Sequence, residues 1–420
     1  MNGRPAWMRL LRGLLGLSLP LWQAALQHRL RRGKETPQSL DQKLMHRPAQ
    51  RPAGPLIWGH AVGVGEAQAL VGLFALMAER LPAHHFLITT TARTSAQALA
   101  SGLPPRCLHQ FAPIDTPATT RAFLDHWQPS LALWCEMDLW PCILHATGVR
   151  EIPRVLINAR FTNASLQRKL RLRPFHAALL GEFDRLYAQD DTSARGLVAL
   201  GAPAARVKVA GTIKALARPL PCDAAEWARW QPINAQRPVW LAASSHAGEE
   251  AVVLQAHRQL REEHPTALLI IAPRYPLRGP EVAALAASAG PVGLRSLGES
   301  ARPEHAVYVA DTIGEMGLWY RLACVAFMGG SLVGVGGHNP FEPLALGCRV
   351  LHGPQVHNFA PSYAALGEDS FTRLASTPQD IASAVREAWQ EGRSPPLENW
   401  RGAQGALQMV DELALMAGQG

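Results

Sequence analysis

The chain has 420 residues, of which 48% are hydrophobic and 18% are charged, and this globular composition excludes a disordered, collagen-like or coiled-coil protein. At roughly 150 residues per domain, the length predicts two or three domains. The formal net charge is +8, but nine basic residues and only two acidic ones lie in the first 50 positions, so the rest of the chain is nearly neutral. A nucleic-acid groove, which needs basic side chains along a binding face, is therefore not expected.

Residues 1–48 form a basic and apolar segment that is expected to associate with an anionic membrane surface. Residues 13–28 are uncharged, and basic side chains flank them on both sides: Arg4, Arg9 and Arg12 before them, and Arg29, Arg31, Arg32 and Lys34 after them. The stretch is shorter than the ~20 apolar residues that span a bilayer. This favours a segment lying in the interface, with Trp7 and Trp22 at headgroup depth. A short tilted span and a helix packed on its own domain are the alternatives.

Short apolar runs alternate with helical periodicity along the rest of the chain, which predicts βαβ units and parallel sheets. A helix is expected between the first two runs, where five apolar residues recur at helical spacing: Leu70, Leu73, Phe74, Met77 and Leu81. Strands are expected in the first half at 56–58, 85–88, 131–134, 155–157 and 207–209, and in the second half at 239–241, 267–271, 306–309, 325–327 and 350–351.

Residues 215–236 contain three prolines and are the expected linker between two domains. The predicted domains are 49–214 and 237–420, and the last helices of the second domain are free to cross back to the first. Two doubly wound, Rossmann-like α/β domains facing a cleft are therefore expected, with ligands at the carboxyl ends of the strands.

Neither a metal site nor a disulfide framework is expected. The six cysteines show neither C-x-x-C nor zinc-ligand spacing, and most of them lie in apolar runs. The chain also lacks Asp-x-Asp and His-Glu-x-x-His motifs.

Polar side chains follow several predicted strands of the first half. Glu66 closes the block G-V-G-E after the first strand, Glu136 and Asp138 follow the third, and the blocks N-A-R and G-T-I-K follow the last two, the latter ending at Lys214. Because the carboxyl ends of parallel strands meet at one edge of a sheet, these groups are expected to converge on a site. The alternatives are a favourable helix-dipole position for Glu66 and a solvated loop for Glu136.

The second half carries a comparable set of loops. S-S-H-A-G-E-E follows its first strand, P-R-Y-P its second, and a loop containing G-E-M its third. Five glycines then lie within residues 329–337, and His338 separates them from the block N-P-F-E at 339–342, which is expected to open a helix. Such a backbone can approach a phosphate or a ribose closely, whereas a mobile surface loop is the alternative.

In order and spacing these blocks, from G-V-G-E to G-G-H-N-P-F-E-P, resemble those of the 3-deoxy-D-manno-octulosonic acid (Kdo) transferase family. The resemblance implies a GT-B glycosyltransferase fold with an N-terminal acceptor domain and a C-terminal domain that binds CMP-Kdo. It implies transfer of Kdo from CMP-Kdo to the lipid A precursor, of the lipid IVA type, in lipopolysaccharide core biosynthesis at the cytoplasmic side of the inner membrane. CMP-Kdo is then a co-substrate, and no cofactor is expected.

The resemblance also implies roles for individual residues. Glu66 is the expected general base, while Glu136 and Lys214 stabilise the transition state. CMP contacts are expected at Pro273, Arg274, Gly314, Glu315, Met316, Asn339, Pro340, Phe341 and Glu342. The family reaction inverts the anomeric centre, and the cations Lys214 and Arg274 are expected to balance the leaving monophosphate without a metal ion.

Three blocks depart from the family pattern. The chain has G-V-G-E where the family has S-V-G-E, E-M-D where it has E-T-E, and P-R-Y-P where it has P-R-H-P. A nucleotide-sugar epimerase of the same fold is one alternative, although it would not need the basic N-terminal segment. A basic membrane-binding or nucleic-acid-binding protein is the other.

Overall fold

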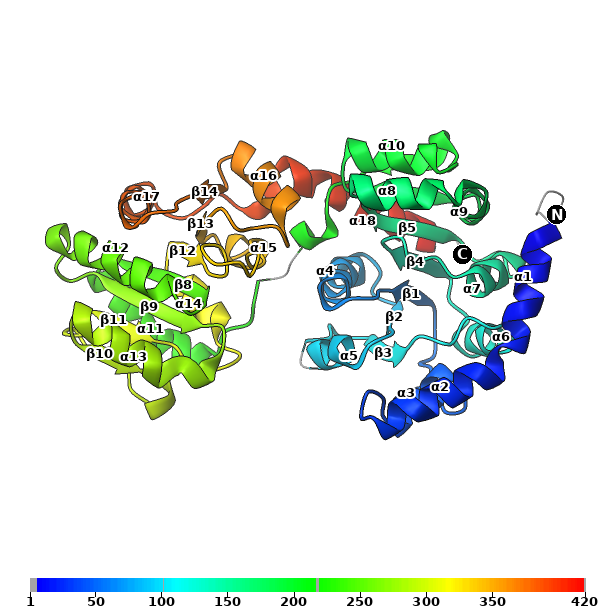
Figure 1. Ribbon diagram of the computed structural model, residues 1–420, viewed down its shortest axis with the longest axis horizontal. Coiled ribbons are helices and arrows are strands. Elements are labelled where there is room, and N and C mark those ends of the chain that lie inside the picture. The colour runs from blue at the N-terminus through cyan, green and yellow to red at the C-terminus, as the bar shows by residue number, and fades with distance from the viewer. Residues whose placement is uncertain (1–5, 101, 217–218, 419–420) are drawn as a thin grey trace. The chain divides into compact units, whose positions relative to one another are not determined.

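Figure 1 shows the computed structural model, which describes residues 6–100, 102–216 and 219–418. The chain divides into two compact units. The first comprises Met1–Ala217 together with Arg401–Gly420, and the second comprises Arg218–Trp400. Each unit is built on a parallel sheet with helices packed against it, as the alternating apolar runs and helical stripes predict. That the two domains face a cleft stays a prediction.

The sheet of the first unit has the order β3-β2-β1-β4-β5-β6-β7 in the described part of the chain, and every pair is parallel. The order reverses between β1 and β4, where a doubly wound sheet offers its ligand site. Its strands are β1 (Leu56–His60), β2 (His85–Thr90), β3 (Cys107–Phe111), β4 (Leu131–Cys135), β5 (Arg154–Ala159), β6 (Arg185–Ala188) and β7 (Val207–Val209).

Alternating side chains of these strands fill two separate cores. Ile57 of β1 packs with apolar residues of α4 and α18, whereas Trp58 packs on the other face, with Phe123 and Leu179. The helices of this unit after the N-terminal segment are α4 (Val64–Arg80), α5 (Arg93–Leu99), α6 (Pro117–Trp127), α7 (Pro141–Val149), α8 (Asn163–Leu170), α9 (Arg173–Leu180), α10 (Asp191–Ala199) and α18 (Arg401–Gly418), with short turns η1 (Ala204–Arg206) and η2 (Ile213–Leu216).

The sheet of the second unit has the order β10-β11-β9-β8-β12-β13-β14, again parallel throughout, and reverses between β8 and β12. Its strands are β8 (Val239–Ser245), β9 (Leu268–Pro273), β10 (Val292–Leu294), β11 (Val307–Val309), β12 (Val325–Met328), β13 (Arg349–His352) and β14 (Thr372–Leu374). Its helices are α11 (Ala224–Gln236), α12 (Glu249–Glu263), α13 (Gly279–Ala286), α14 (Met316–Leu322), α15 (Phe341–Leu344), α16 (Ala360–Glu368) and α17 (Pro378–Glu391), with short turns η3 (Pro276–Arg278), η4 (Ala287–Ala289), η5 (Arg295–Leu297) and η6 (Leu397–Asn399).

All ten predicted strands are present, and the structure adds β3, β6, β10 and β14. β3, β10 and β14 lie at or next to a sheet edge and are short or interrupted by polar residues, so their sequences lack a continuous apolar run. β6 has four residues and begins with an exposed arginine.

The boundaries of the units differ from the predicted linker and C-terminal domain. The unit boundary lies after Ala217, and α11 occupies more than half of the expected linker. Trp230 of α11 is fully buried against Tyr308 and Trp319, so this helix is part of the second unit's core. At the other end of the chain, α18 returns to the first unit, which the prediction had left open.

The N-terminal segment folds as three helices on the first unit: α1 (Ala6–Leu17), α2 (Leu19–Arg31) and α3 (Pro37–Lys43). Met8 and Leu26 are buried, and the Trp7 ring packs against that of Phe175, with ring centroids 6.0 Å apart. The opposite side of α1 and α2 exposes large apolar side chains: Leu10, Leu14, Leu17, Leu21 and Trp22. No helix among the described residues has the length and apolar character needed to cross a bilayer.

Candidate active site

Glu66 lies in the first turn of α4, directly after β1 at the reversal point of the first sheet. Its carboxylate folds back over Gly63, the residue that caps the helix. A Cβ atom at position 63 would lie 2.2 Å from Glu66 Oε2, so a side chain there would have to displace the carboxylate. The change from the family's S-V-G-E to G-V-G-E therefore leaves Glu66 room at the helix N-terminus.

Glu136 follows β4, the strand next to β1, with a left-handed φ of 65°. A residue other than glycine is strained in this region, so the loop geometry is held by its surroundings. Burial raises the pKa of Glu136 to about 7, and the negative charge of Glu66 raises it as well. The positive charges of Lys214 and Arg160 oppose this shift. Glu136 can therefore carry a proton near neutral pH.

Lys214 lies in η2, and its Nζ atom is 3.9 Å from Glu66 Oε1. The loop before it is tied to the end of β5, because Asn158 Oδ1 accepts hydrogen bonds from Ile213 N (3.2 Å) and Thr212 Oγ1 (3.4 Å). Asn158 itself has a φ of 59°, so its amide is aimed by another strained position at a strand end.

Helix α18 supports the same loop from the other side. Gly211 has a φ of +75°, and a Cβ atom there would lie 2.2 Å from the carbonyl oxygen of Gly402. Glycine is therefore required at 211 both for its conformation and for the close approach of α18. The C-terminal helix crosses back to the first unit at the point where it buttresses the Lys214 loop.

The structure thus brings together the three predicted catalytic residues, which are separated by up to 148 positions in the sequence and come from the ends of β1, β4 and β7. Two carboxylates and one ammonium group occupy a small, half-buried space. Such a group can accept a proton, hold a second one, and stabilise negative charge. Among the described residues, no cluster of three or more His, Cys, Asp or Glu side chains could hold a metal ion.

Asp138 and His60 form a second polar pair beside this group. His60 is buried at the end of β1, and its Nε2 atom lies 3.3 Å from Asp138 Oδ2, while its Nδ1 atom lies 3.0 Å from Thr89 Oγ1. The pKa of Asp138 is lowered by the hydrogen bond from His60 against the opposing effect of burial. Sequence reasoning missed His60, and a histidine ending an otherwise apolar strand is the signal that could have found it.

In the second unit, Arg274 follows β9, and its backbone N–H donates to Ser245 O (2.9 Å). Burial raises the pKa of Glu342 and lowers that of His338, and the nearby charge of Arg274 opposes the first shift and adds to the second. The structure therefore brings these loops close together. Glu342 accepts a hydrogen bond from Asn339 Nδ2 (3.2 Å), and Asn339 Oδ1 accepts one from Phe341 N (3.1 Å). The block N-P-F-E opens α15 at Phe341, as expected.

The remaining residues predicted to contact CMP lie at the same edge of the sheet, but they differ in how exposed they are to solvent. Pro273 ends β9, Gly314 has a φ of +91° in an exposed loop, and Met316 starts α14. Pro340 and Phe341 are buried, and the Phe341 ring packs 5.7 Å from that of Trp400. Their side chains thus face the interior of the unit.

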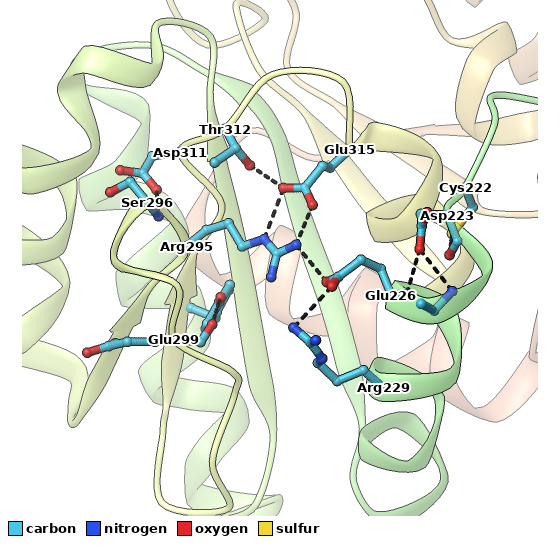
Figure 2. Close-up of polar contacts among 12 residues, drawn as sticks. Cys222, Asp223, Glu226, Arg229, Arg295, Ser296, Glu299, Asp311, Thr312 and Glu315 are labelled. Atoms are coloured by element: carbon cyan, nitrogen blue, oxygen red, sulfur yellow. Dashed lines mark hydrogen bonds and ion pairs between the residues drawn. The ribbon is translucent and has the colours of Figure 1, made fainter.

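Glu315 is held by a residue that the sequence did not single out. Figure 2 shows Arg295 in contact with both of its carboxylate oxygens: Nε donates to Oε2 (3.0 Å) and Nη2 to Oε1 (2.5 Å). Thr312 donates a further hydrogen bond to Oε2. The hydrogen bonds from Arg295 lower the pKa of Glu315.

Glu249 and His246 shape the glycine-rich loop. The carboxylate of Glu249 is fully buried and accepts hydrogen bonds from four backbone N–H groups, those of His246, Gly330, Ser331 and Leu332 (2.7–3.0 Å). His246 Nε2 lies 3.0 Å from His338 Nε2 in the loop that follows β12. The block S-S-H-A-G-E-E is recognisable in the sequence because it directly follows a predicted strand, but its partner loop is visible only in the fold.

Comparison with known proteins agrees with this geometry. A family model described as 3-deoxy-D-manno-octulosonic-acid transferase (kdotransferase) matches residues 38–217. The chain is 34% identical over 388 residues to the probable mitochondrial 3-deoxy-D-manno-octulosonic acid transferase of Arabidopsis thaliana, covering 90% of this chain and 87% of that protein. It is 32% identical over 338 residues to the 3-deoxy-D-manno-octulosonic acid transferase of Haemophilus influenzae, covering 78% of each.

Among solved structures, the UDP-GlcNAc 2-epimerase of Neisseria meningitidis bound to UDP-GlcNAc is similar, with a TM-score of 0.57 over 87% of this chain and 100% of that chain. At 13% identity, this likeness shows the fold alone. The two doubly wound units confirm the predicted GT-B fold. On the identity shared with its relatives over most of its length, the chain belongs to the family of 3-deoxy-D-manno-octulosonic acid transferases, which are glycosyltransferases.

Proposed function

We propose that this chain transfers Kdo from CMP-Kdo to a lipid A precursor of the lipid IVA type, in lipopolysaccharide core biosynthesis. The acceptor binds the first unit, and the donor binds the second. The observation that carries the proposal is the convergence of Glu66, Glu136 and Lys214 on one edge of the first sheet. The family to which the chain belongs supports the same reaction class.

In the proposed step, Glu66 removes the proton from an acceptor hydroxyl while that oxygen attacks the anomeric carbon of Kdo. The bond between the anomeric carbon and the phosphate oxygen breaks, and its electron pair leaves with CMP, so the centre inverts in one displacement. A positioned base typically contributes about 10²–10⁴-fold to such a reaction. Protonated Glu136 can donate a hydrogen bond, which an ionised carboxylate cannot do, and Lys214 balances the remaining negative charge near Glu66.

The second unit is proposed to hold CMP through Arg274, the loop Gly314–Glu315–Met316, and the block from Asn339 to Glu342. The Arg274 guanidinium can form charge-assisted hydrogen bonds to the leaving phosphate. Together with Lys214, it is proposed to supply the positive charge, so that neither a metal ion nor a cofactor takes part.

A transfer assay tests the reaction. Purified enzyme is incubated with CMP-Kdo and lipid IVA, with and without EDTA, and the mass of the lipid is measured by mass spectrometry. A mass increase of one or more Kdo residues, unchanged by EDTA, is expected. Lipid IVA left unmodified while CMP-Kdo is consumed would contradict the proposed acceptor. Loss of turnover in EDTA that magnesium restores would contradict the metal-free mechanism.

The exposed side of α1 and α2 is proposed to bind the anionic surface of the inner membrane on its cytoplasmic side. Leu17 and Leu21 are 78% and 74% exposed there, and arginines and a lysine of the same segment lie close by in the sequence. Apolar side chains buried in the headgroup boundary and cations near anionic lipids both favour binding. The face opposite to it packs on the first unit, so the segment serves both as part of that unit and as the membrane contact.

Substitution of this face tests the membrane proposal more cleanly than deletion. Glu35, Ser39, Leu40 and Gln42, in and just before α3, are buried, so deletion of residues 1–48 would remove part of the first unit's packing. In the double variant L17E/L21E, binding to anionic vesicles should fall about tenfold or more, because burying one leucine contributes about 1.5–3 kcal/mol. The control L297E changes an equally exposed leucine (70%) of the second unit and should bind normally. Equal vesicle binding by both variants would place the membrane contact elsewhere.

A further inference from the structure

Arg295 occupies the centre of a polar network in the second unit. It begins η5, between β10 and β11, and its side chain is only 12% exposed. Figure 2 shows its guanidinium between two carboxylates, with Glu315 on one side and Glu226 on the other. The contact with Glu315 uses two parallel hydrogen bonds, of 3.0 and 2.5 Å, and this fork geometry fixes the carboxylate plane as well as its position.

Glu226 holds Arg295 in turn. Arg295 Nη2 lies 2.6 Å from Glu226 Oε2, and Arg229 Nη1 lies 3.0 Å from Glu226 Oε1. Glu226 lies in the first turn of α11, which Asp223 caps by accepting hydrogen bonds from the N–H groups of Ala225 and Glu226. The guanidinium carbon also lies 5.9 Å from the ring centroid of Trp319. Arg295 is therefore held by α11, through Glu226, and by α14, through Trp319, as well as by Glu315 itself.

We propose that Arg295 is a positioning residue for the nucleotide, and that it holds Glu315 as a fixed hydrogen-bond acceptor facing the donor substrate. This inference rests on the proposed function, in which Glu315 contacts CMP. Each carboxylate oxygen has lone pairs to spare after binding Arg295. An acceptor held in this way favours ribose hydroxyls or the amino group of cytosine, and it repels a carbonyl oxygen at the same place.

The charge state of Glu315 gives a signature that a merely structural role would lack. With Arg295 in place, the pKa of Glu315 is lowered, so the carboxylate is ionised in mildly acidic solution. Without Arg295, the main cause of this shift is lost and burial still raises the pKa. Several other titratable or charged groups interact with this network: Cys222, Asp223, Glu226 and Arg229, in α11 or just before it, Arg321 of α14, Tyr308 of β11, and Glu299. A variant lacking the guanidinium should therefore lose its acceptor as the pH falls.

Calorimetric titration with CMP tests the inference at pH 8 and pH 5.5. R295M is expected to bind CMP more weakly than the wild type, with the deficit growing to about tenfold at pH 5.5. E315Q should show an equal deficit at both pH values. R229M removes a guanidinium that pairs with Glu226 in the same network, and it should bind CMP like the wild type. Dividing the CMP dissociation constant of each variant by that of the wild type at the same pH cancels the effect of the titration of CMP itself.

Two further variants keep the test decisive. R295K retains the positive charge and should recover most of the affinity at pH 5.5, and thermal melting of each variant checks that it is folded. In the double variant R295M/E315Q, CMP should bind no more weakly than in E315Q, because Arg295 acts through Glu315. Repeating the titrations with UMP identifies the part of the nucleotide that Glu315 contacts. A loss confined to CMP points to the cytosine amino group, and an equal loss points to the ribose, both in accord with the inference.

The outcomes separate the inference from the function on which it rests. If E315Q weakens CMP binding but R295M binds normally, or loses affinity equally at both pH values, the role of Arg295 is overturned and the proposed CMP site stands. If E315Q binds CMP like the wild type, the assignment of Glu315 to the nucleotide is itself overturned.

Discussion

Both units place carboxylates at the carboxyl ends of strands in a doubly wound sheet, yet give them opposite electrostatic surroundings. In the first unit, Glu136 lies beside another carboxylate, Glu66, and its pKa is raised to about 7. In the second, Glu315 is clamped by Arg295 and its pKa is lowered. A third carboxylate, Glu249, needs no side-chain cation, because four backbone N–H groups satisfy it.

The comparison shows that the carboxyl ends of the strands bring polar side chains together, whereas the neighbouring residues determine their charge and therefore their chemistry. Two like charges in a half-buried site favour holding a proton, as proton transfer requires. A carboxylate paired with an arginine stays ionised, as recognition of a ligand requires. A carboxylate that accepts hydrogen bonds from backbone N–H groups holds a loop in place. The first edge is thus suited to reaction and the second to binding.

The largest expected effect follows from Glu66→Gln. Glutamine keeps the size of the side chain but cannot accept a proton, so kcat should fall about 100-fold or more, equivalent to about 3 kcal/mol of barrier. CMP affinity should be unchanged, because the nucleotide is proposed to bind the second unit. Single-turnover transfer and CMP titration on one preparation measure both. E304Q, an exposed glutamate of the second unit, is the matched control.

A different result would contradict the role of Glu66 as the general base. If Glu66 only complements the dipole of α4, the substitution should cost about 0.3–1 kcal/mol of stability and leave turnover almost unchanged. Near-wild-type turnover would then direct attention to Glu136 or Asp138.

The second effect concerns stability, measured for Glu249→Gln by denaturant unfolding. The amide group would point an N–H donor at backbone N–H groups that now donate to a carboxylate, so the free energy of unfolding should fall by about 2–4 kcal/mol. CMP binding should weaken as well, because the loop before Asn339 loses its anchor. An unfolding free energy within 0.5 kcal/mol of the wild type, on the order of a surface substitution, would show that the buried carboxylate is dispensable.

Glu136→Gln should instead raise the free energy of unfolding, and this is the smallest of the expected effects. Because burial and Glu66 raise the pKa of Glu136 from its ordinary 4.5 to about 7, the folded chain binds more protons than the unfolded chain between these values. Wild-type stability therefore falls as the pH rises through this window. Glutamine has no proton to lose, so E136Q should be more stable than the wild type by about 2 kcal/mol at pH 8.

The pH dependence provides the internal control for that prediction. At pH 4.5 the folded wild type is already protonated at Glu136, so the advantage of E136Q should nearly vanish. Thermal melting at both pH values measures the difference. A destabilised E136Q at pH 8 would mean that the ionised carboxylate has partners that outweigh its burial and its repulsion from Glu66.

Local sequence was sufficient for the elements whose patterns are strong. The strand at Leu56 and the stripe from Leu70 to Leu81 predicted β1 and α4, because a buried parallel strand needs a continuous apolar run and a helix packed on one face needs a 3.6-residue repeat. The same reasoning placed Glu66, Glu136 and Lys214 at strand ends, where the parallel sheet brings them together. The edge strands and α11 lack such runs, so only their pairing and packing revealed them.

Only the tertiary structure decided what each polar group meets. Nothing near Glu315 in the sequence indicates Arg295, 20 positions earlier, or Glu226, 69 positions before that arginine. Nothing near Lys214 indicates that Gly402 of the last helix closes on its loop. Apolar periodicity is a local property that each segment carries with it, whereas the pKa of a carboxylate depends on charges within a few ångströms, and in this protein those charges come from distant parts of the chain. The sequence by itself therefore determined the fold class and the meeting point of the predicted catalytic residues, and the folded chain decided their partners and protonation.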